Sequence, residues 1–322
     1  MSSFQASTAQ LYGLLHVADA VGAHANLSAK SGDPIDIYLK CAALCAASVA
    51  TAGGSFALIT NHAARLAARC KALGLDHLQL REYRFVWPVP EGVAFYSAHY
   101  KLELIEAFAT GAFGVRVGLI DVDTVLQKAF DLPDIAEGAL AIYDITDIER
   151  ASYGTDRIRQ DIETVAGKSF PDARWYGGEF IIGDPRAFAT LARAVKSCWG
   201  NYTQAIGKLH HVGDEAVVSA AINLARLEGF ATVNADRGGG VARWWTARTE
   251  APVRRFREIE NRSLLHLPSD KEFLAAYPCA GFDGARFVSA YRSYAGRKLR
   301  LRRLANFVAG LLGRGKYVAR LD

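Results

Sequence analysis

The chain has 322 residues, of which 51% are hydrophobic and 22% charged, so it can bury one large α/β core, with or without a small appendage, and a disordered protein is excluded. Its net charge of +5 is unevenly spread, because residues 284–321 hold ten Lys or Arg and no Asp or Glu. The rest carries 28 basic against 33 acidic side chains. This acidic body offers no extended track for nucleic acid, whereas the basic tail predicts an anionic partner.

The five cysteines lack paired Cys-x-x-Cys spacing, which favours buried, reduced thiols over disulfides or structural zinc. Residues 1–10 are polar and do not resemble a signal peptide, so we expect a cytoplasmic protein. The longest stretch without a charged residue, 41–64, contains Gly53, Gly54, Asn61 and His62. It therefore fits a core helix and a following strand better than a membrane span.

The first half of the chain alternates short apolar runs with helical patterns. Strands are predicted at residues 11–18, 56–60, 77–85 and 115–120, and helices at residues 37–50, 63–73 and 98–109. This order predicts a mostly parallel sheet with helices on both faces, a Rossmann-like α/β fold. In such sheets, ligands bind beyond the carboxyl ends of the strands.

The second half is less regular. Strands are predicted at residues 139–143, 231–234 and 241–246, and helices at residues 185–196 and 214–227. No internal repeat or low-complexity linker is visible. We therefore expect one domain over residues 1–283 and a basic helical extension over residues 284–322.

The extension carries an amphipathic pattern. Its apolar residues recur at steps of three and four and are Leu301, Leu304, Val308, Leu311 and Leu312. Its clustered basic residues are Arg297, Lys298, Arg300, Arg302 and Arg303. The uncharged part is too short to cross a bilayer, so the pattern predicts a helix lying on an anionic membrane surface. The alternative is that the stripe packs on the protein's own core.

Asp121 and Asp123 follow the apolar run 115–120 directly, which places two carboxylates at the carboxyl end of a buried strand. Both can reach a hard divalent cation, and a cation that bridges two phosphates stabilises the charge of a diphosphate leaving group. An Asp-x-Asp triplet also occurs by chance in turns. The position at the end of the central strand favours the metal site.

Four segments resemble glycosyltransferases that have one nucleotide-binding α/β domain, the GT-A fold, and an Asp-x-Asp motif, especially the retaining families of glycogenin, the lipopolysaccharide galactosyltransferases and the blood-group transferases. They are residues 119–123 (LIDVD), 175–180 (WYGGEF), 211–215 (HVGDE) and 264–271 (LLHLPSDK). The segments occur in the family's order over roughly residues 11–275. The histidine-to-lysine spacing is one residue short of the usual pattern, and the family's glycine and Lys-Pro-Trp ending are absent.

The resemblance implies a metal-dependent transfer of a hexose from a UDP-sugar to a hydroxyl of a glycan or glycolipid, with retained configuration. It implies that His266 completes the metal site with Asp121 and Asp123, and that Lys271 contacts the donor's phosphates. Imidazole beside two carboxylates favours Mn²⁺ over Mg²⁺. A core histidine at the end of a strand is the alternative for His266.

The resemblance gives further residues expected roles. Glu215 would face the donor sugar as the catalytic carboxylate, and Asp214 is the less favoured candidate for this role. The alternative for both is that acidic residues stabilise the start of a helix. Asp19 and Lys101 would hold the base and the diphosphate, unless they are solvent-exposed. The segment that would line the donor-sugar and acceptor pocket consists of Tyr176, Gly177, Gly178 and Glu179. Its two glycines predict a sharp turn or a close backbone approach to a ligand.

Two alternatives come from other functional classes, and the first of them uses the same residues. Residues 119–126 also resemble the first motif of haloacid-dehalogenase-like phosphatases, in which Asp121 would be the phosphorylated nucleophile and Asp123 a general acid. Residues 212–214 resemble the last motif of these phosphatases. Two features count against this alternative: the first motif usually lies on the first strand, and Val218 stands where the last motif has a further acidic residue. The other alternative is a non-catalytic protein of the same fold that binds a membrane surface through its tail.

Overall fold

The fold is a mixed α/β fold built around one seven-stranded sheet. The computed structural model describes residues 3–4, 9–17, 33–130, 134–311 and 316–322. The strand order is β10-β8-β9-β5-β2-β3-β4, and β9 runs antiparallel to both of its neighbours while the other pairs are parallel. The strands are β2 (Gln10–Leu15), β3 (Ser55–Thr60), β4 (Leu80–Glu82), β5 (Val117–Ile120), β8 (Leu140–Asp144), β9 (Tyr176–Gly183) and β10 (Thr232–Asn234).

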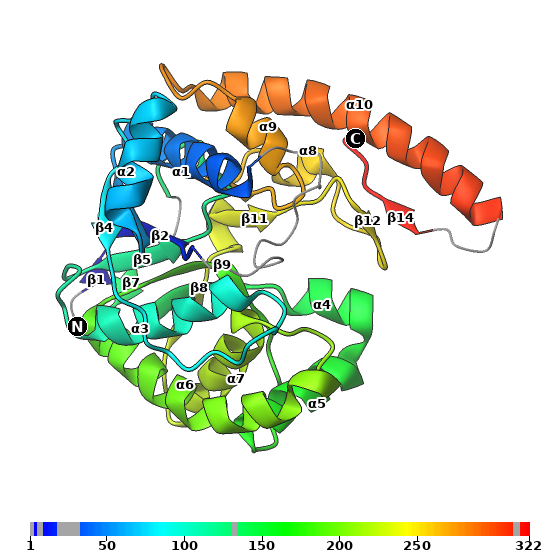
Figure 1. Cartoon of the computed structure of the whole chain (residues 1–322). Helices are drawn as coiled ribbons and strands as arrows, with labels where there is room; N and C mark the ends of the chain where they lie inside the picture. The colour runs from blue at the N-terminus through cyan, green and yellow to red at the C-terminus, as the bar shows by residue number, and fades with distance from the viewer. Residues whose placement is uncertain (1–2, 5–8, 18–32, 131–133, 312–315) are drawn as a thin grey trace.

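Helices cover both faces of this sheet, as Figure 1 shows: α1 and α2 lie on one side, and α3, α6 and α7 on the other. The helices are α1 (Pro34–Thr51), α2 (Ala63–Ala72), α3 (Lys101–Ala109), α4 (Thr146–Tyr153), α5 (Thr155–Ala166), α6 (Pro185–Ala205), α7 (Asp214–Leu227), α8 (Phe256–Ile259), α9 (Lys271–Ala276) and α10 (Gly284–Leu311). A short helix with 3-10 geometry, η2 (Tyr96–Tyr100), leads into α3. The predicted α/β architecture is confirmed.

A second, smaller sheet has the order β11-β13-β6, with strands β11 (Val241–Arg243), β13 (Leu264–His266) and β6 (Thr124–Leu126). Because β6 follows β5 after only three residues, the small sheet begins at the carboxyl edge of the large one. Two further pairs join β1 (Ser3–Phe4) to β7 (Ile135–Ala136), and β12 (Arg248–Thr249) to β14 (Tyr317–Val318).

Helix α1 lies between two hydrophobic clusters. Leu39, Ala42 and Val49 belong to the cluster around the large sheet, whereas Ile37 and Leu44 belong to the one around the small sheet and α10. A helix buried on two sides is apolar all round. Consequently α1 is, among the described helices, the one long and apolar enough to cross a membrane by length and composition, although its position is that of a core helix.

Two expectations about strands were wrong. The strand predicted at residues 77–85 is only the three residues of β4. Residues 176–179 do not form a turn but begin β9, the central antiparallel strand. Their glycines instead leave space for carboxylates of the protein itself, which lie close to the backbone of β9.

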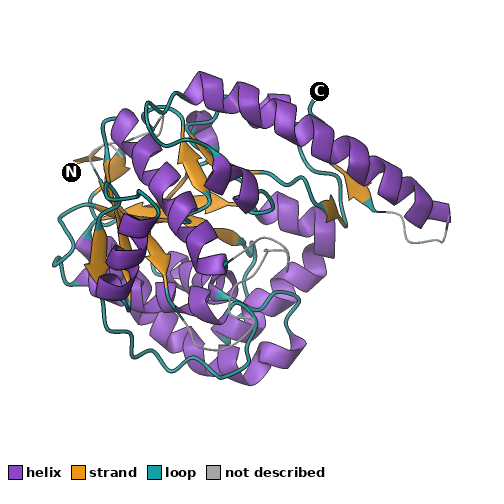
Figure 2. Ribbon diagram, turned by 45° about the horizontal axis from the view of Figure 1, so that its top comes forward, coloured by secondary structure: helices purple, strands orange, loops and turns teal. Residues whose placement is uncertain are grey.

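The two halves of α10 differ in their surroundings. Phe287, Tyr291 and Leu299 are buried in the cluster around the small sheet, whereas Leu301, Leu304 and Phe307 are exposed. Figure 2 shows the end of α10 extending past the body of the protein, beside the β12–β14 pair. Of the predicted apolar stripe, Leu312 and the side chains of Val308 and Leu311 lie outside the described parts of the structure.

Candidate active site

The two aspartates lie in the turn between β5 and β6. The backbone N–H of Asp121 donates to the carbonyl of Glu179 over 3.1 Å, and the Thr124 hydroxyl donates to the carbonyl of Asp121 over 2.6 Å. The carbonyl of Asp123 accepts from the N–H of Leu267 over 3.1 Å. Both sheets therefore fix the turn that carries the carboxylates.

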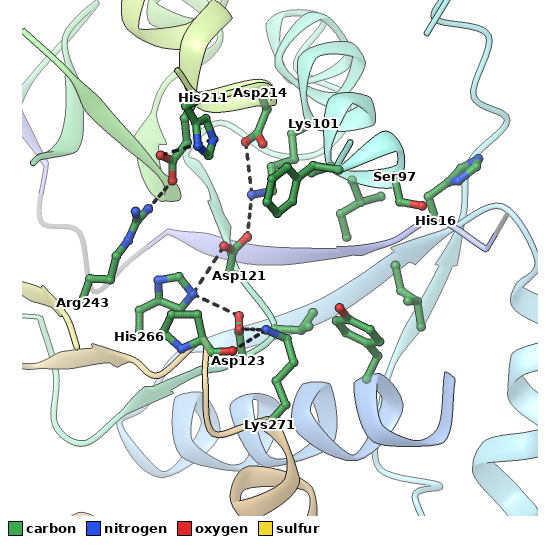
Figure 3. Close-up of a pocket in the computed structure, with 18 of the residues that line it drawn as sticks. His16, Ser97, Lys101, Asp121, Asp123, His211, Asp214, Arg243, His266 and Lys271 are labelled. Carbon is green, nitrogen blue, oxygen red and sulfur yellow. Dashed lines mark hydrogen bonds and ion pairs between the residues drawn. The ribbon is translucent and has the colours of Figure 1, made fainter. Parts of the chain in front are cut away.

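His266 joins the aspartates through the register of the small sheet. It ends β13, and its Cα pairs with that of Thr124, next to Asp123. Its Nε2 atom lies 3.2 Å from Oδ1 of Asp123 and 3.7 Å from Oδ2 of Asp121. One potential ligand atom from each of the three residues lies within 4.8 Å of the other two. Residues separated by more than 140 positions thus form one cluster (Figure 3).

Two lysines neutralise the aspartates. Lys101 Nζ lies 2.6 Å from Oδ1 of Asp121, 3.3 Å from Oδ2 of Asp214 and 3.0 Å from the carbonyl of Gly178. Lys271 Nζ lies 2.5 Å from Oδ2 of Asp123. Burial would raise the pKa of Asp123, but the charges on Lys271 and His266 hold it well below its ordinary value. For Asp121, burial outweighs Lys101 and His266 and raises the pKa.

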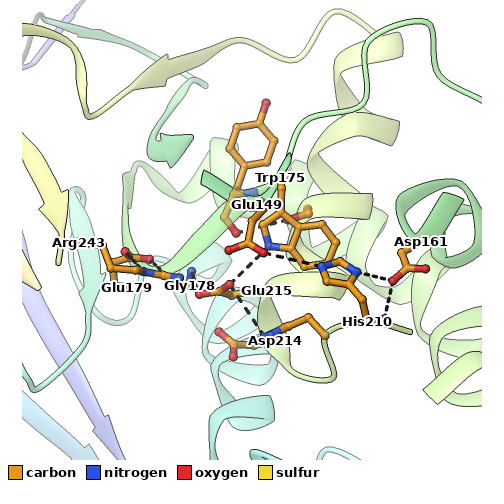
Figure 4. A network of polar contacts seen from close by, with 12 residues as sticks. Glu149, Asp161, Trp175, Gly178, Glu179, His210, Asp214, Glu215 and Arg243 are labelled. Carbon is orange, nitrogen blue, oxygen red and sulfur yellow. Dashed lines mark hydrogen bonds and ion pairs between the residues drawn. The ribbon is translucent and has the colours of Figure 1, made fainter. Parts of the chain in front are cut away.

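A second group of charges includes Arg243 at the end of β11, which Figure 4 shows beside Glu179. Arg243 donates to both carboxylate oxygens of Glu179, from Nε over 2.6 Å and from Nη2 over 2.5 Å, and it also contacts Glu215. Glu215 accepts from the N–H of Gly178 over 3.2 Å and from Nε1 of Trp175 over 3.4 Å. Glu215 therefore opens α7 with its carboxylate held by three donors.

The glycines of β9 make room for these carboxylates. A Cβ atom on Gly177 would lie 2.0 Å from Oε2 of Glu179, and one on Gly178 would lie 2.4 Å from Oδ2 of Asp214. Asp214 directly follows the N-cap Gly213, and its carboxylate is paired with Lys101. The carboxylates of α7 thus face the start of β9.

Most of the predicted site residues meet in one cavity of about 340 Å³. Those that line it are Asp121, Asp123, Lys101, Asp214, Glu215, His266 and Lys271. The side chain of Tyr176 lines a different cavity, and Glu179 is fully buried and lines neither. Gly177 and Gly178 do not line it, but the backbone of Gly178 contacts Lys101 and Glu215, which do. Asp19 lies outside the described residues.

Several residues of the cavity were not predicted. Arg243 was missed, although it lies in the strand predicted at residues 241–246; in the structure it ends β11 and pairs with His266 of β13. His211 belongs to a segment that carried the resemblance, and its Nε2 lies 3.9 Å from Oε2 of Glu215. Trp245 and Tyr153 also line the cavity. Aromatic residues on loops and helix ends carry no sequence pattern that would distinguish them from core residues.

The donor set fits a divalent cation. The two carboxylates are hard ligands that suit Mg²⁺ and Mn²⁺. The imidazole is a borderline ligand, which favours Mn²⁺ over Mg²⁺. Asp123 and His266 are buried, and Asp121 is partly exposed toward the cavity, so the cluster is open on one side. An open position is what a cation needs to bind a substrate's phosphates.

No protein-family model and no curated protein sequence matches the chain. The solved structures to which its backbone is similar include three glycosyltransferases.

One is the galactosyltransferase LgtC in complex with donor and acceptor sugar analogues, with a TM-score of 0.49 and 13% identity over 89% of this chain and 95% of that one. The bifunctional glycosyltransferase WbbM has a TM-score of 0.44 and 11% identity over 83% of this chain and 46% of that one. Mouse xyloside xylosyltransferase 1 has a TM-score of 0.44 and 12% identity over 80% and 97%. These likenesses concern the course of the backbone alone.

Proposed function

We propose that the protein is a metal-dependent glycosyltransferase that moves a hexose from a UDP-sugar to a hydroxyl of a glycan or glycolipid, with retained configuration. The observation that supports this most is the cluster of Asp121, Asp123 and His266 at the carboxyl edge of the sheet, flanked by Lys101 and Lys271 in one open cavity. This arrangement combines ligands for a cation with positive charge for a diphosphate.

Asp121, Asp123 and His266 would hold the cation, and we favour Mn²⁺ because of the imidazole. When bound, the cation would stabilise the negative charge that builds on the departing diphosphate. Lys271 and Lys101 lie beside the aspartates and supply further positive charge to the phosphates. Their ammonium groups are already desolvated, which strengthens this attraction.

Glu215 and Asp214 face the same cavity from the start of α7. A carboxylate there would stabilise positive charge on the anomeric carbon of the donor sugar. Because Glu215 accepts hydrogen bonds from Arg243, Gly178 and Trp175, its carboxylate is held in one orientation. We favour it over Asp214, whose carboxylate is held by Lys101 at 3.3 Å rather than by three donors.

The geometry supports the phosphatase alternative less well. Its general acid would be Asp123, but Lys271 Nζ at 2.5 Å favours the ionised carboxylate, which has no proton to give. The sheet also places an antiparallel strand, β9, directly beside the strand that leads into Asp121. The non-catalytic alternative leaves the combination of metal ligands, lysines and carboxylates in one cavity without a role.

We further propose that the protein is cytoplasmic and binds the inner face of the membrane through the end of α10. The exposed side chains of Leu301, Leu304 and Phe307 support this, together with the basic residues among them. An acceptor that is a glycolipid would be found at such a surface. Apolar and cationic side chains together are what an interfacial helix needs.

The activity is tested by incubating the purified protein with a panel of nucleotide sugars and Mn²⁺ and measuring released UDP. Asp123→Asn should lower UDP release at least about 100-fold, because it removes a ligand of the cation. Asp156→Asn is the control, since this carboxylate is exposed on α5, and it should leave the rate unchanged. Hydrolysis of a generic phosphomonoester that Asp121→Asn abolishes would instead support the phosphatase.

A further inference from the structure

Glu179 is a fully buried carboxylate that faces His266 from behind. It follows the glycine pair of β9, and its Oε1 atom lies 3.3 Å from Nδ1 of His266. On the other side, Arg243 donates two hydrogen bonds to it. Arg243 is always charged and presents two donors to the two oxygens, and this pairing favours the ionised carboxylate although the site is buried.

An ionised carboxylate at this position determines which nitrogen of the imidazole carries the proton. A carboxylate is only an acceptor, so Nδ1 of His266 must be the donor. With the proton kept on Nδ1, Nε2 is the nitrogen whose lone pair is offered to a cation held by the aspartates, since it lies 3.2 Å from Oδ1 of Asp123. Partners of this kind fix the ring orientation of histidines that bind metals.

Arg243 holds this carboxylate and connects it to the other side of the site. Its two donors fix the plane of the Glu179 carboxylate, and its Nη2 atom also contacts Glu215. The pair requires a glycine in β9, because a Cβ atom on residue 177 would lie 2.0 Å from Oε2 of Glu179 and 3.0 Å from Nη2 of Arg243. Gly177 therefore has no side chain at the place in β9 where the Glu179–Arg243 ion pair lies.

We propose that Glu179 is a positioning residue of the metal site, which fixes the tautomer and orientation of His266. Arg243 holds Glu179 in place and also contacts Glu215. It thereby connects the proposed metal ligands to the carboxylate that we propose faces the donor sugar. This inference rests on the proposed function, since it requires His266 to be a ligand. It assigns Glu179 a role behind the site rather than in contact with the sugar.

The test is calorimetric titration of the full chain with Mn²⁺ alone, without nucleotide. Glu179→Gln keeps the size of the side chain, but its amide offers a donor as well as an acceptor and no longer dictates the tautomer. We expect 10- to 100-fold weaker Mn²⁺ binding, the usual effect of losing such a partner. The control is Glu103→Gln, another buried glutamate, which accepts backbone N–H groups of Val86 and Trp87 and does not line the cavity. It should leave Mn²⁺ affinity unchanged.

A second readout is the NMR signal of the His266 Nδ1–H in the Mg²⁺-loaded protein, where the cation holds Nε2. The unaltered chain should show this proton shifted downfield by its hydrogen bond to the Glu179 carboxylate, and Glu179→Gln should move the signal upfield. If Glu179→Gln does not fold, Arg243→Lys replaces it, because lysine keeps the charge but not the two-donor geometry, and it should also weaken Mn²⁺ binding.

Equal Mn²⁺ affinity of the unaltered chain and the variant, an unchanged Nδ1–H signal, or an equal loss in Glu103→Gln would each overturn the positioning role while the metal site stands. Failure of the unaltered chain to bind Mn²⁺ or Mg²⁺ would overturn both the inference and the proposed metal dependence.

Discussion

At the scale of single residues, each carboxylate of the site is paired with a positively charged lysine or arginine side chain. Asp121 pairs with Lys101, Asp123 with Lys271, and Glu179 and Glu215 share Arg243. Breaking one such buried pair leaves an uncompensated charge, which costs about 3–5 kcal/mol. The pairs therefore couple the position of each carboxylate to that of its partner.

Gly178→Ala should damage the site although it adds only a methyl group and no charge. Its Cβ would lie 2.4 Å from Oδ2 of Asp214 and 3.2 Å from Cγ of Glu215, so the start of α7 must shift. A misplacement of this size beside reacting groups lowers the rate by about 100-fold. The measurement is UDP release together with thermal unfolding.

Gly200→Ala is the matched control for that substitution. Gly200 lies in the exposed face of α6, and a Cβ there meets nothing within 4 Å. The change should stabilise the protein by about 0.4–1 kcal/mol and leave the rate unchanged. If both variants lost activity equally, the packing of α7 against β9 would not be the cause.

At the scale of elements, the segment between α6 and α7 carries His211 into the cavity and is held by His210. The N–H and Nδ1 of His210 lie 2.7 Å and 2.5 Å from Oδ2 of Asp161 in α5, and its Nε2 lies 3.8 Å from Glu149 in α4. Figure 4 shows His210 between Asp161 and Trp175. The start of α7, with its two acidic residues, thus depends on α4 and α5.

The pH dependence of unfolding tests this attachment. Burial lowers the pKa of His210, but Asp161 and Glu149 outweigh it and raise the pKa above its ordinary value of about 6.5. The stabilisation by charged His210 is therefore complete below about pH 6.5 and is lost as the pH rises through the raised, folded-state pKa. His210→Gln should cost about 1.5–3 kcal/mol in urea unfolding at pH 6 and less at pH 9.

The other charged groups around His210 do not change the sign of this prediction. Arg157 lies 3.1 Å from Oδ1 of Asp161 and stays charged throughout, and the Tyr153 ring packs 4.6 Å from His210 with its pKa raised by burial. The pKa of Asp161 is lowered: burial would raise it, but hydrogen bonds from His210 outweigh this, so it is ionised at pH 6. An energetic cost of His210→Gln that does not vary with pH would contradict the assignment.

A second element, α10, is attached by its first half. Tyr291 is fully buried, and its hydroxyl donates to Oδ2 of Asp270 over 2.7 Å, while Lys298 lies 2.6 Å from Oδ1 of the same carboxylate. Lys298 is thus engaged with the protein itself, although the sequence grouped it with the membrane-facing basic residues.

Tyr291→Ala should destabilise the protein by about 3–5 kcal/mol, because it opens a cavity between α10 and the small sheet. Tyr291→Phe removes only the hydroxyl and should cost about 1 kcal/mol, since Thr246 and Lys298 still bind Asp270. The half-exposed Tyr317 gives the comparison, and Tyr317→Ala should stay within about 0.5 kcal/mol. Urea unfolding measures all three, and similar losses for Tyr291→Ala and Tyr317→Ala would argue against the attachment.

Elements with a clear period were predictable from the sequence, and those set by long-range contacts were not. The pattern predicted α1, β5 and α7 to within a few residues. It misread the start of β9, because glycine normally breaks a strand and only the folded chain shows the carboxylates that need the space. The proximity of Asp121, Asp123 and His266 came from a resemblance, since no local pattern encodes the pairing of β13 with β6.

At the scale of the whole molecule, the division into a domain of residues 1–283 and an extension of residues 284–322 remains a prediction. The contacts of α10 bear on how the extension is attached. The first half of α10 shares a hydrophobic cluster with residues of the small sheet and α8, such as Leu265 and Phe256. Removing everything after residue 283 would expose that cluster. The exposed second half of α10 is the part to alter if membrane binding is to be separated from stability.

Binding to an anionic membrane should therefore depend on the exposed end of α10 alone. The full chain should sediment with vesicles of phosphatidylglycerol and phosphatidylcholine and be released at high salt, because the attraction of exposed Arg297, Arg300 and Arg303 is screened. Replacing Leu301, Leu304 and Phe307 by serine should abolish sedimentation without lowering stability, since these side chains are exposed. The control replaces Val86 and Val115, which are at least as exposed but lie far from α10 in the sequence. Sedimentation that is equal for both sets of variants would rule out the end of α10 as the anchor.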